Sequence, residues 1–310
     1  MTNGSHTLNA LLEQLQQFNL QSSVDSSLLA IQENANNHLQ INALCQALIN
    51  EGERHNQSAW AAHMTSSPTA TSILGQVLAG LHNGNLLSPQ LYPLLEKVEQ
   101  QLITWFCQLY QHQHGHFTAG ATYANLEALW QAREHCSHDS KLIYGSHASH
   151  FSVAKACQIL GLTFQAIDTD EYDRILPSAL ADACQQQVPV AVVLTAGTSA
   201  CGEIDPLTEC IKICQQFQCW SHIDAAWGAG LVLLEQYQQL FSAVATADSV
   251  TIDPHKAFSQ PKPCGVLLYK RPLNPLLSID ANYLEHEPKQ ILPGSFGGEL
   301  FLPLWSSLMF

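Results

Sequence analysis

The chain has 310 residues, of which 46% are hydrophobic, enough to fill the core of one or two domains. The formal net charge of −14 argues against nucleic acid or an anionic membrane as a partner, but does not exclude a local pocket for a phosphate. No apolar run is long enough to span a bilayer, and the ten cysteines, without a signal peptide, fit reduced thiols in a cytoplasmic protein.

The first residues, up to about residue 56, are polar and have a helical spacing of apolar side chains. Leu11, Leu15 and Phe18 recur at the interval that places them on one face of a helix. This pattern predicts an N-terminal helical arm, whose apolar stripe we expect to pack on another subunit.

Residues 57–95 contain several residues that interrupt regular structure, including Pro68 and Pro93. This composition predicts a loop-rich stretch. We therefore expect an N-terminal helical and loop segment over residues 1–95 and a large α/β domain over residues 96–310.

From Gly115 onward, short strand-like runs alternate with helical patterns. The predicted strands are Leu142–Tyr144, Val188–Thr195, Trp220–Ala225, Val250–Asp253 and Val266–Tyr269, and the predicted helices are Leu94–Tyr110, Tyr123–Arg133, Phe151–Leu160 and Leu207–Phe217. The run Val188–Thr195 is almost continuously apolar, as strands buried on both faces are. The alternation predicts an α/β fold with a mainly parallel sheet flanked by helices.

Two groups of potential metal ligands are explained better without a metal. His112, His114 and His116 alternate in a Gln-rich stretch, which favours a solvated linker, with a metal protein as the alternative. Cys210 and Cys214 lie one helical turn apart without the spacing of a structural zinc site, which favours helix packing.

Lys256 is the most informative residue, because Lys and Arg together number only 12. It follows the β-branched run Ser249–Ile252 and the triplet Asp253-Pro254-His255. That position places it at the carboxyl end of a strand, where α/β enzymes keep their sites. An amine there suits a nucleophile that forms a Schiff base with a carbonyl cofactor, and the alternative is an ordinary strand-end lysine.

Other segments supply what a pyridoxal phosphate site needs. Gly120-Ala121-Thr122 opens a helix, where backbone N–H groups can bind a phosphate, although small residues begin many helices. Asp224 ends a strand and can keep a pyridine nitrogen protonated, although an Asp there can also cap a turn. His150 and Ala226 suit the two faces of a flat ring, with helix capping as the alternative role of His150.

In this order the motifs resemble the group II pyridoxal-phosphate-dependent amino-acid decarboxylases, which include glutamate, aromatic amino-acid, cysteine-sulfinate and 2,4-diaminobutyrate decarboxylases. The resemblance covers roughly Ser58 to the end of the sequence. Its strongest segments are Phe117–Leu126, Ser149–Ser152, Thr195–Thr198, His222–Gly228 and Asp248–Lys256. It implies a fold-type-I transferase-like fold with a seven-stranded type of sheet, and a homodimer whose site lies near the subunit interface.

The resemblance also implies roles for single residues. Lys256, His150 and Asp224 are the implied catalytic residues: Lys256 forms the internal aldimine, Asp224 contacts the pyridine nitrogen and His150 stacks on the ring. The implied cofactor-binding residues are Ala121, Thr122, His150, Ser199, Asp224, Ala226, His255 and Lys256. The implied reaction is exchange of the Schiff base onto an L-amino acid, loss of CO2 and protonation at Cα, without a metal. Asp253 is not placed on the phosphate, because like charges repel.

The sequence departs from the family pattern in several places. Ala121 stands where the family often has Gly, and Ala257 where an aromatic or large apolar residue often follows the lysine. Residues Glu285–Pro293 lack the Tyr that several members bring to the protonation step, and the Arg and Lys usual around the later Leu-Trp pair are missing near Leu304-Trp305. The family normally continues past Phe310 into a small C-terminal domain. The alternative function is therefore a truncated or degenerate relative that binds the cofactor and dimerises without turnover.

The identity of the amino acid is poorly determined by the sequence. His63, Ser66 and Asn83 lie where the resemblance places the substrate pocket. No Arg is present there to bind a second carboxylate, which disfavours glutamate and is compatible with a diamino acid.

Overall fold

The computed structural model describes residues 47–48, 64–272 and 291–309. The contacts of the chain divide it into two units, Met1–Gln57 and Ser58–Phe310. The predicted N-terminal arm therefore lies almost entirely outside the described residues.

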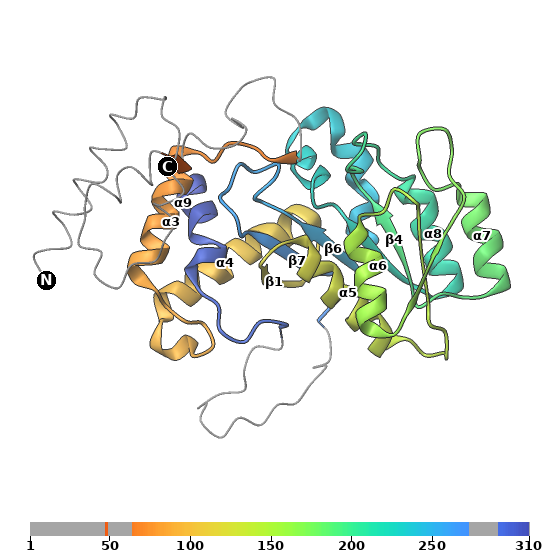
Figure 1. Ribbon diagram of the computed structural model, residues 1–310, viewed down its shortest axis with the longest axis horizontal. Helices are drawn as coiled ribbons and strands as arrows, with labels where there is room; N and C mark the ends of the chain where they lie inside the picture. Colours follow the sequence, from red (N-terminus) through yellow and green to blue (C-terminus); the bar gives the residue numbers. More distant parts are fainter. Residues whose placement is uncertain (1–46, 49–63, 273–290, 310) are drawn as a thin grey trace, which may run out of the picture. The chain divides into compact units, whose positions relative to one another are not determined.

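The described residues contain one sheet of seven strands (Figure 1). The strands are β1 (His114–Thr118), β2 (Leu142–Gly145), β3 (Thr163–Ala166), β4 (Ala191–Thr195), β5 (Trp220–Asp224), β6 (Ser249–Ile252) and β7 (Gly265–Tyr269). Their order across the sheet is β1-β7-β6-β5-β4-β2-β3. Strand β7 is antiparallel to both of its neighbours, and the other neighbouring pairs are parallel. The predicted mainly parallel, seven-stranded α/β fold is confirmed.

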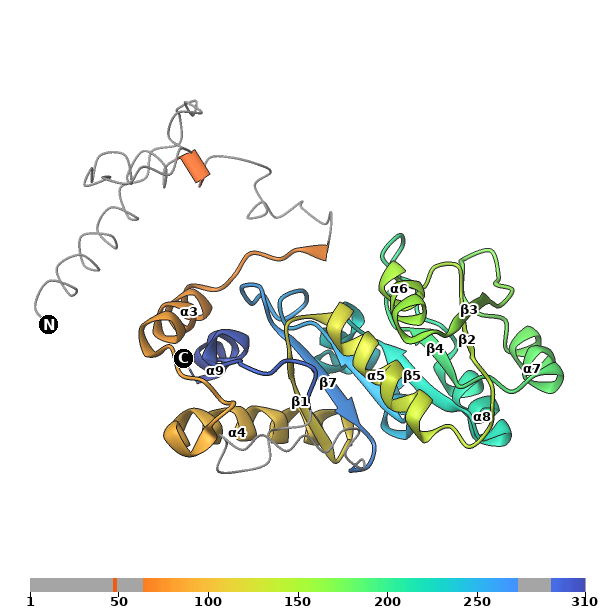
Figure 2. The same ribbon diagram turned by 60° about the horizontal axis from the view of Figure 1, so that its bottom comes forward.

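Helices cover both faces of this sheet (Figure 2). The helices of the described residues are α3 (Ala70–His82), α4 (Pro93–Tyr110), α5 (Ala121–His135), α6 (Phe151–Leu160), α7 (Pro177–Gln186), α8 (Leu207–Phe217) and α9 (Leu302–Met309), with 3-10 segments at η3 (Pro89–Leu91), η4 (Gly228–Leu233), η5 (Glu235–Thr246) and η6 (Gly298–Leu300). Val193 of β4 packs in a cluster with α5 and α6, whereas Val192 and Leu194 pack in a cluster with α4, α7 and α8. Alternate side chains of this apolar strand therefore fill two separate cores, as its sequence predicted.

Helices α6 and α8 have the predicted bounds. In α8 the buried residues Leu207, Cys210, Ile211 and Cys214 follow the spacing of one helical face. The predicted role of the two cysteines in packing is confirmed. Helix α6 ends at Gly161, whose φ of 67° is accessible to glycine without strain.

The stretch predicted to be loop-rich contains helix α3. Its glycines obscured the helical pattern, since Gly is a poor helix former, yet Gly75 has a packing role. A Cβ built on Gly75 would lie 2.5 Å from the carbonyl oxygen of Leu302, at the beginning of α9. This close approach joins α3 to α9, and both helices lie in the unit Ser58–Phe310.

Of the histidines predicted to lie on a solvated linker, His114 and His116 belong to strand β1 and His112 precedes it. His112 and His116 are buried. His112 Nδ1 lies 2.8 Å from the carbonyl oxygen of Tyr110, and His116 Nε2 lies 3.0 Å from Glu127 Oε1. The linker prediction was wrong because pairing with β7 outweighed the low strand propensity of this stretch. The described residues contain no group of three or more side chains suited to a metal, and none of their helices is long and apolar enough to cross a membrane.

Candidate active site

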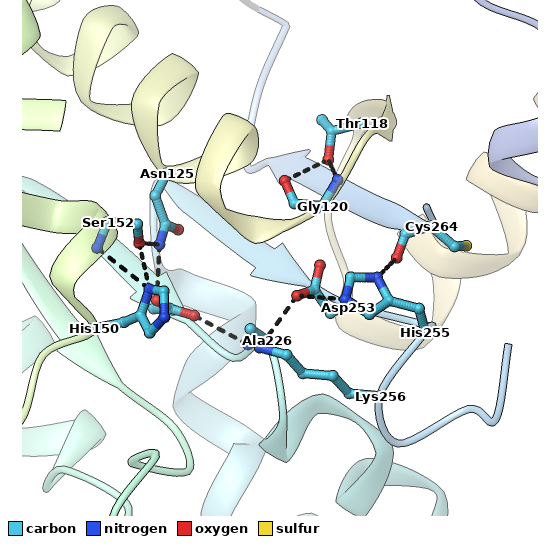
Figure 3. Close-up of polar contacts among 11 residues, drawn as sticks. Thr118, Gly120, Asn125, His150, Ser152, Ala226, Asp253, His255, Lys256 and Cys264 are labelled. Carbon is cyan, nitrogen blue, oxygen red and sulfur yellow. Dashed lines mark hydrogen bonds and ion pairs between the residues drawn. The ribbon is translucent and has the colours of Figure 1, made fainter. Parts of the chain in front are cut away.

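The candidate residues meet at one edge of the sheet. Asp224 is the last residue of β5, and it is paired with Thr195 of β4 on one side and Thr251 of β6 on the other. The chain after β6 carries Lys256, and helices α5 and α6 begin beside the same edge (Figure 3). The carboxyl ends of parallel strands are where α/β folds bind ligands.

Lys256 lies in a turn directly after β6 and forms an ion pair there. Its Nζ lies 3.2 Å from Asp253 Oδ2, and His255 Nε2 lies 3.4 Å from the same oxygen. Burial raises the pKa of the Asp253 carboxyl, and the charges of His255 and Lys256 oppose that shift. The hydroxyl of Ser66 donates to the backbone oxygen of Lys256, which fixes the turn to the segment before α3. The amine is thus held next to a buried carboxyl group that can exchange a proton with it.

Asp224 is a buried carboxylate surrounded by donors. Its Oδ2 accepts a hydrogen bond of 2.8 Å from Asn125 Nδ2, and its Oδ1 accepts one of 3.1 Å from the backbone N–H of Ala226. These two N–H donors fix the orientation of the carboxylate. Such a group can bind a protonated ring nitrogen, and Ala226 beside it has no side chain beyond Cβ to obstruct a flat ring.

The first turn of α5 suits an anion. Gly120 precedes the helix with a φ of 123°, which favours glycine, and within the described chain no side chain caps the helix. The N–H groups of Ala121 and Thr122 are therefore available to a phosphate, whereas those of Tyr123 and Ala124 donate to the Gly120 carbonyl oxygen. A Cβ on Gly120 would lie 3.4 Å from His255 Cε1, so the imidazole lies beside this helix end. His255 Nδ1 lies 2.6 Å from the Cys264 carbonyl oxygen and must donate to it.

His150 caps helix α6 and lies near the other candidate residues (Figure 3). Its Nδ1 lies 2.8 Å from Ser152 Oγ and accepts the backbone N–H of Ser152 at 3.3 Å. Burial lowers the pKa of the imidazole, while the charge of Asp224 opposes the shift. The capping role proposed as the alternative is therefore present. It uses only the ring edge, so a ring face can still stack on a cofactor.

The structure does not bring every predicted site residue next to Lys256 and Asp224. Ser199 is exposed in the turn after β4, and its role at the cofactor stays a prediction. The neighbouring Thr198 is buried and accepts the N–H of Glu203 at 3.1 Å. Two of the residues predicted to line the substrate pocket lie at opposite ends of helix α3. Ser66 precedes the helix, and Asn83 is exposed after its last residue. The helix has 13 residues and is about 20 Å long. His63 and most of the segment Glu285–Pro293 lie outside the described residues.

Several polar residues of the site were given no role in the prediction from the sequence. They are Asn125, Ser152, His222 and Ser249. One signal was available, because Asn125 lies four residues after Ala121 and so falls on the same face of the helix. The partners on β6 could not be found without knowing which strands are neighbours.

Comparison with known proteins places the chain in a family. Residues 22–295 match the pyridoxal-dependent decarboxylase conserved domain. The chain is 34% identical over 242 residues to L-2,4-diaminobutyrate decarboxylase of Rhizobium meliloti, covering 73% of this chain and 48% of that protein. It is 30% identical over 275 residues to aspartate 1-decarboxylase of Aliivibrio fischeri, covering 74% and 50%. The chain thus spans about half the length of these relatives.

Solved structures share the fold. The crystal structure of mouse CSAD in apo form superposes with a TM-score of 0.81 at 20% identity, covering 98% of this chain and 74% of that one. The glutamate decarboxylase domain of the diaminobutyrate-pyruvate transaminase and L-2,4-diaminobutyrate decarboxylase from Vibrio parahaemolyticus gives a TM-score of 0.74 at 25% identity, covering 86% and 65%. On the domain match and this fold, the chain belongs to the pyridoxal-dependent decarboxylase family.

Proposed function

We propose that this chain binds pyridoxal 5'-phosphate and acts as a carboxy-lyase, releasing CO2 from an L-amino acid. The observation that carries the proposal is the placement of Lys256 and Asp224 at the ends of neighbouring strands, beside the uncapped start of α5. An amine, a carboxylate and a helix N-terminus match the aldehyde, the ring nitrogen and the phosphate of that cofactor, so the described residues fit it.

Each candidate residue has a part in holding the group. Lys256 supplies the amine for the aldehyde, Asp224 pairs with the ring nitrogen, and His150 and Ala226 flank the ring. Ala121, Thr122 and His255 bind the phosphate, and Ser199 lies near the cofactor and substrate. When bound, the cofactor supplies an electron sink for the pair that CO2 leaves behind.

The chain itself has to move protons. Lys256 must lose one to become a nucleophile, and Asp253 Oδ2 lies 3.2 Å from its Nζ. Because burial raises the pKa of Asp253, this carboxyl group is better suited to accept that proton than an exposed one would be. We therefore assign Asp253 to proton exchange with the lysine and not to the phosphate.

We further propose a cytoplasmic homodimer. All cysteines in the described part of the chain are free thiols, which supports a reducing compartment. Helix α3 exposes the apolar side chains Ile73, Leu74 and Leu81, a surface that a second copy could cover.

Carbon dioxide release tests the activity. The full chain, loaded with pyridoxal 5'-phosphate, is given carboxyl-labelled amino acids, including 2,4-diaminobutyrate, aspartate, glutamate and aromatic amino acids. We expect labelled CO2 from at least one of them and none from Lys256→Ala, because that variant lacks the amine. The control Lys155→Ala removes an exposed lysine of α6 and should keep full activity.

Two results would contradict this proposal. If the loaded chain released no CO2 from any amino acid, it would be a relative that binds the cofactor without turnover. If Lys256→Ala released CO2 at the rate of the unaltered chain, the assignment of the lysine would be wrong.

A further inference from the structure

A line of buried polar side chains leads away from the Asp224 carboxylate. Asn125 Nδ2 lies 2.8 Å from Asp224 Oδ2, and Asn125 Oδ1 lies 3.0 Å from His222 Nε2. His222 Nδ1 lies 2.8 Å from Ser249 Oγ, which lies 2.8 Å from Trp220 Nε1. These five side chains form what we call the Asp224 relay, and Asn125, His222 and Ser249 are fully buried.

The sequence places these residues together in a simple way. Trp220, His222 and Asp224 alternate along β5, so their side chains point to one face of the sheet. Ser249 lies directly opposite His222 on β6. Asn125 comes from α5, the helix that packs on this face.

The contacts allow one direction of donation along the relay. The Asp224 carboxylate only accepts, so the Asn125 amide must turn its N–H groups toward it and its oxygen toward His222. His222 Nε2 must then carry a hydrogen. At the other end, the indole N–H of Trp220 only donates, so the Ser249 hydroxyl accepts it. Because Nε2 carries the hydrogen of the neutral His222 ring, Nδ1 accepts, and the Ser249 hydroxyl donates to it. The Asp224 end therefore sets the tautomer of His222, and the Trp220 end is compatible with it.

The protonation of His222 agrees with this direction. Burial lowers the pKa of its imidazole from 6.5 to about 4, so the ring is neutral near pH 7. A neutral ring has one N–H and one lone pair, which is what the two neighbours need. Thr251 Oγ1 lies 3.5 Å from the same Nε2 and is a weaker neighbour.

A branch of the relay reaches a second residue of the site (Figure 3). Asn125 Nδ2 also donates to Ser152 Oγ at 3.1 Å, and Ser152 Oγ lies 2.8 Å from His150 Nδ1. His150 Nδ1 already accepts the backbone N–H of Ser152 and so carries no hydrogen, which means that the Ser152 hydroxyl donates to the imidazole. One amide thus contacts the residue proposed for the ring nitrogen and, through one hydroxyl, the residue proposed for the ring face.

We propose that Asn125 is a positioning residue that orients Asp224 and His150 for the pyridine ring, and that neutral His222 fixes the orientation of the Asn125 amide. This inference rests on the proposed function, because it concerns the same cofactor. It gives a role to buried polar groups whose hydrogen bonds hold one another in fixed orientations.

Asn125→Asp tests the relay at its centre, because the isosteric acid removes the donor and sets a second carboxyl group against Asp224. Two ligands are titrated into the full cofactor-free chain: pyridoxal 5'-phosphate and an analogue in which C–H replaces the ring nitrogen. We expect the variant to lose about ten- to hundredfold in affinity for the natural cofactor, the size of a hydrogen bond to a charged group. The loss for the analogue should be at least about tenfold smaller, since the analogue makes no contact through a ring nitrogen.

Matched variants distinguish the loss of a positioning contact from a nonspecific effect of the substitution on the fold. Gln131→Glu makes the same amide-to-acid change at a buried position of α5 outside the relay, and should affect both ligands equally. His222→Gln keeps an N–H group near the Nε2 position and should retain cofactor affinity within about threefold, whereas His222→Phe should not.

Equal losses of both ligands in Asn125→Asp, or no loss, would overturn the relay while leaving the proposed function intact. Failure of the unaltered chain to bind pyridoxal 5'-phosphate would overturn both. Should Asn125→Asp not fold, the ¹⁵N chemical shifts of His222 in the unaltered chain decide: the Nε2–H tautomer is expected, and the Nδ1–H tautomer would contradict the relay.

Discussion

At the scale of single residues, burial decides how the titratable groups of this chain behave. His222 is held neutral by desolvation, and its hydrogen bonds then depend on which ring nitrogen carries the proton. Asp205 is a second case: burial raises its pKa to about 6, although its oxygens accept the N–H groups of Thr195 and Ile175. Both side chains are buried away from water and form hydrogen bonds with protein groups instead.

The lowered pKa of His222 predicts a pH dependence of stability. Between about 6.5 and about 4 the unfolded chain binds a proton that the folded chain does not, so stability falls as the pH falls through that window. His222 alone should reduce the free energy of unfolding by roughly 2 kcal/mol between about pH 7 and about pH 5. Asp205 acts in the opposite direction, since its raised pKa makes the folded chain bind the extra proton.

Denaturant unfolding of the unaltered chain and of His222→Gln at both pH values isolates the histidine, because Asp205 contributes equally to both proteins. We expect the variant to lose less stability on acidification, by roughly 2 kcal/mol. Parallel losses in the two proteins would show that His222 is not neutral in the folded chain.

At the scale of elements, the packing of α3 on α9 depends on one glycine. A Cβ on Gly75 would meet the Leu302 carbonyl oxygen at 2.5 Å and Pro303 Cα at 2.6 Å, both of which are backbone atoms that cannot rotate away. A Cβ on Gly80, in the same helix, would meet nothing within 4 Å. The two glycines therefore have different reasons to be present.

Substituting each glycine by alanine should give effects of opposite sign. Gly75→Ala should destabilise the chain by roughly 1–3 kcal/mol through overpacking, while Gly80→Ala should stabilise it by roughly 0.5–1 kcal/mol through helix propensity. Thermal or denaturant unfolding measures both, and a stabilised Gly75→Ala would contradict the close contact between α3 and α9.

The elements also show what local sequence determines. Helices α6 and α8 were predicted with their observed bounds because the spacing of their apolar residues and the residues at their ends indicate the same limits. Helix α3 was missed because glycines that serve packing weaken its pattern, and β1 was missed because its His and Gly residues have little strand propensity. In both cases contacts with distant segments decided the structure.

At the scale of the whole molecule, the sheet order brings Lys256, Asp224, His150 and the start of α5 to one edge. The sequence predicted this convergence because each residue follows a strand or begins a helix. It could not predict the Asp224 relay, since that requires the pairing of β5 with β6 and the packing of α5 on their face. Residues that end elements were thus easier to find than the buried residues that orient them.

We propose that Lys256 carries pyridoxal phosphate, and chemical trapping by reduction tests this assignment. The full chain is incubated with pyridoxal 5'-phosphate, reduced with borohydride, digested and analysed by mass spectrometry. We expect the mass of the reduced cofactor on the peptide that contains Lys256, and no such mass at this position in Lys256→Ala. A reduced cofactor found only on other lysines, or on none, would contradict it.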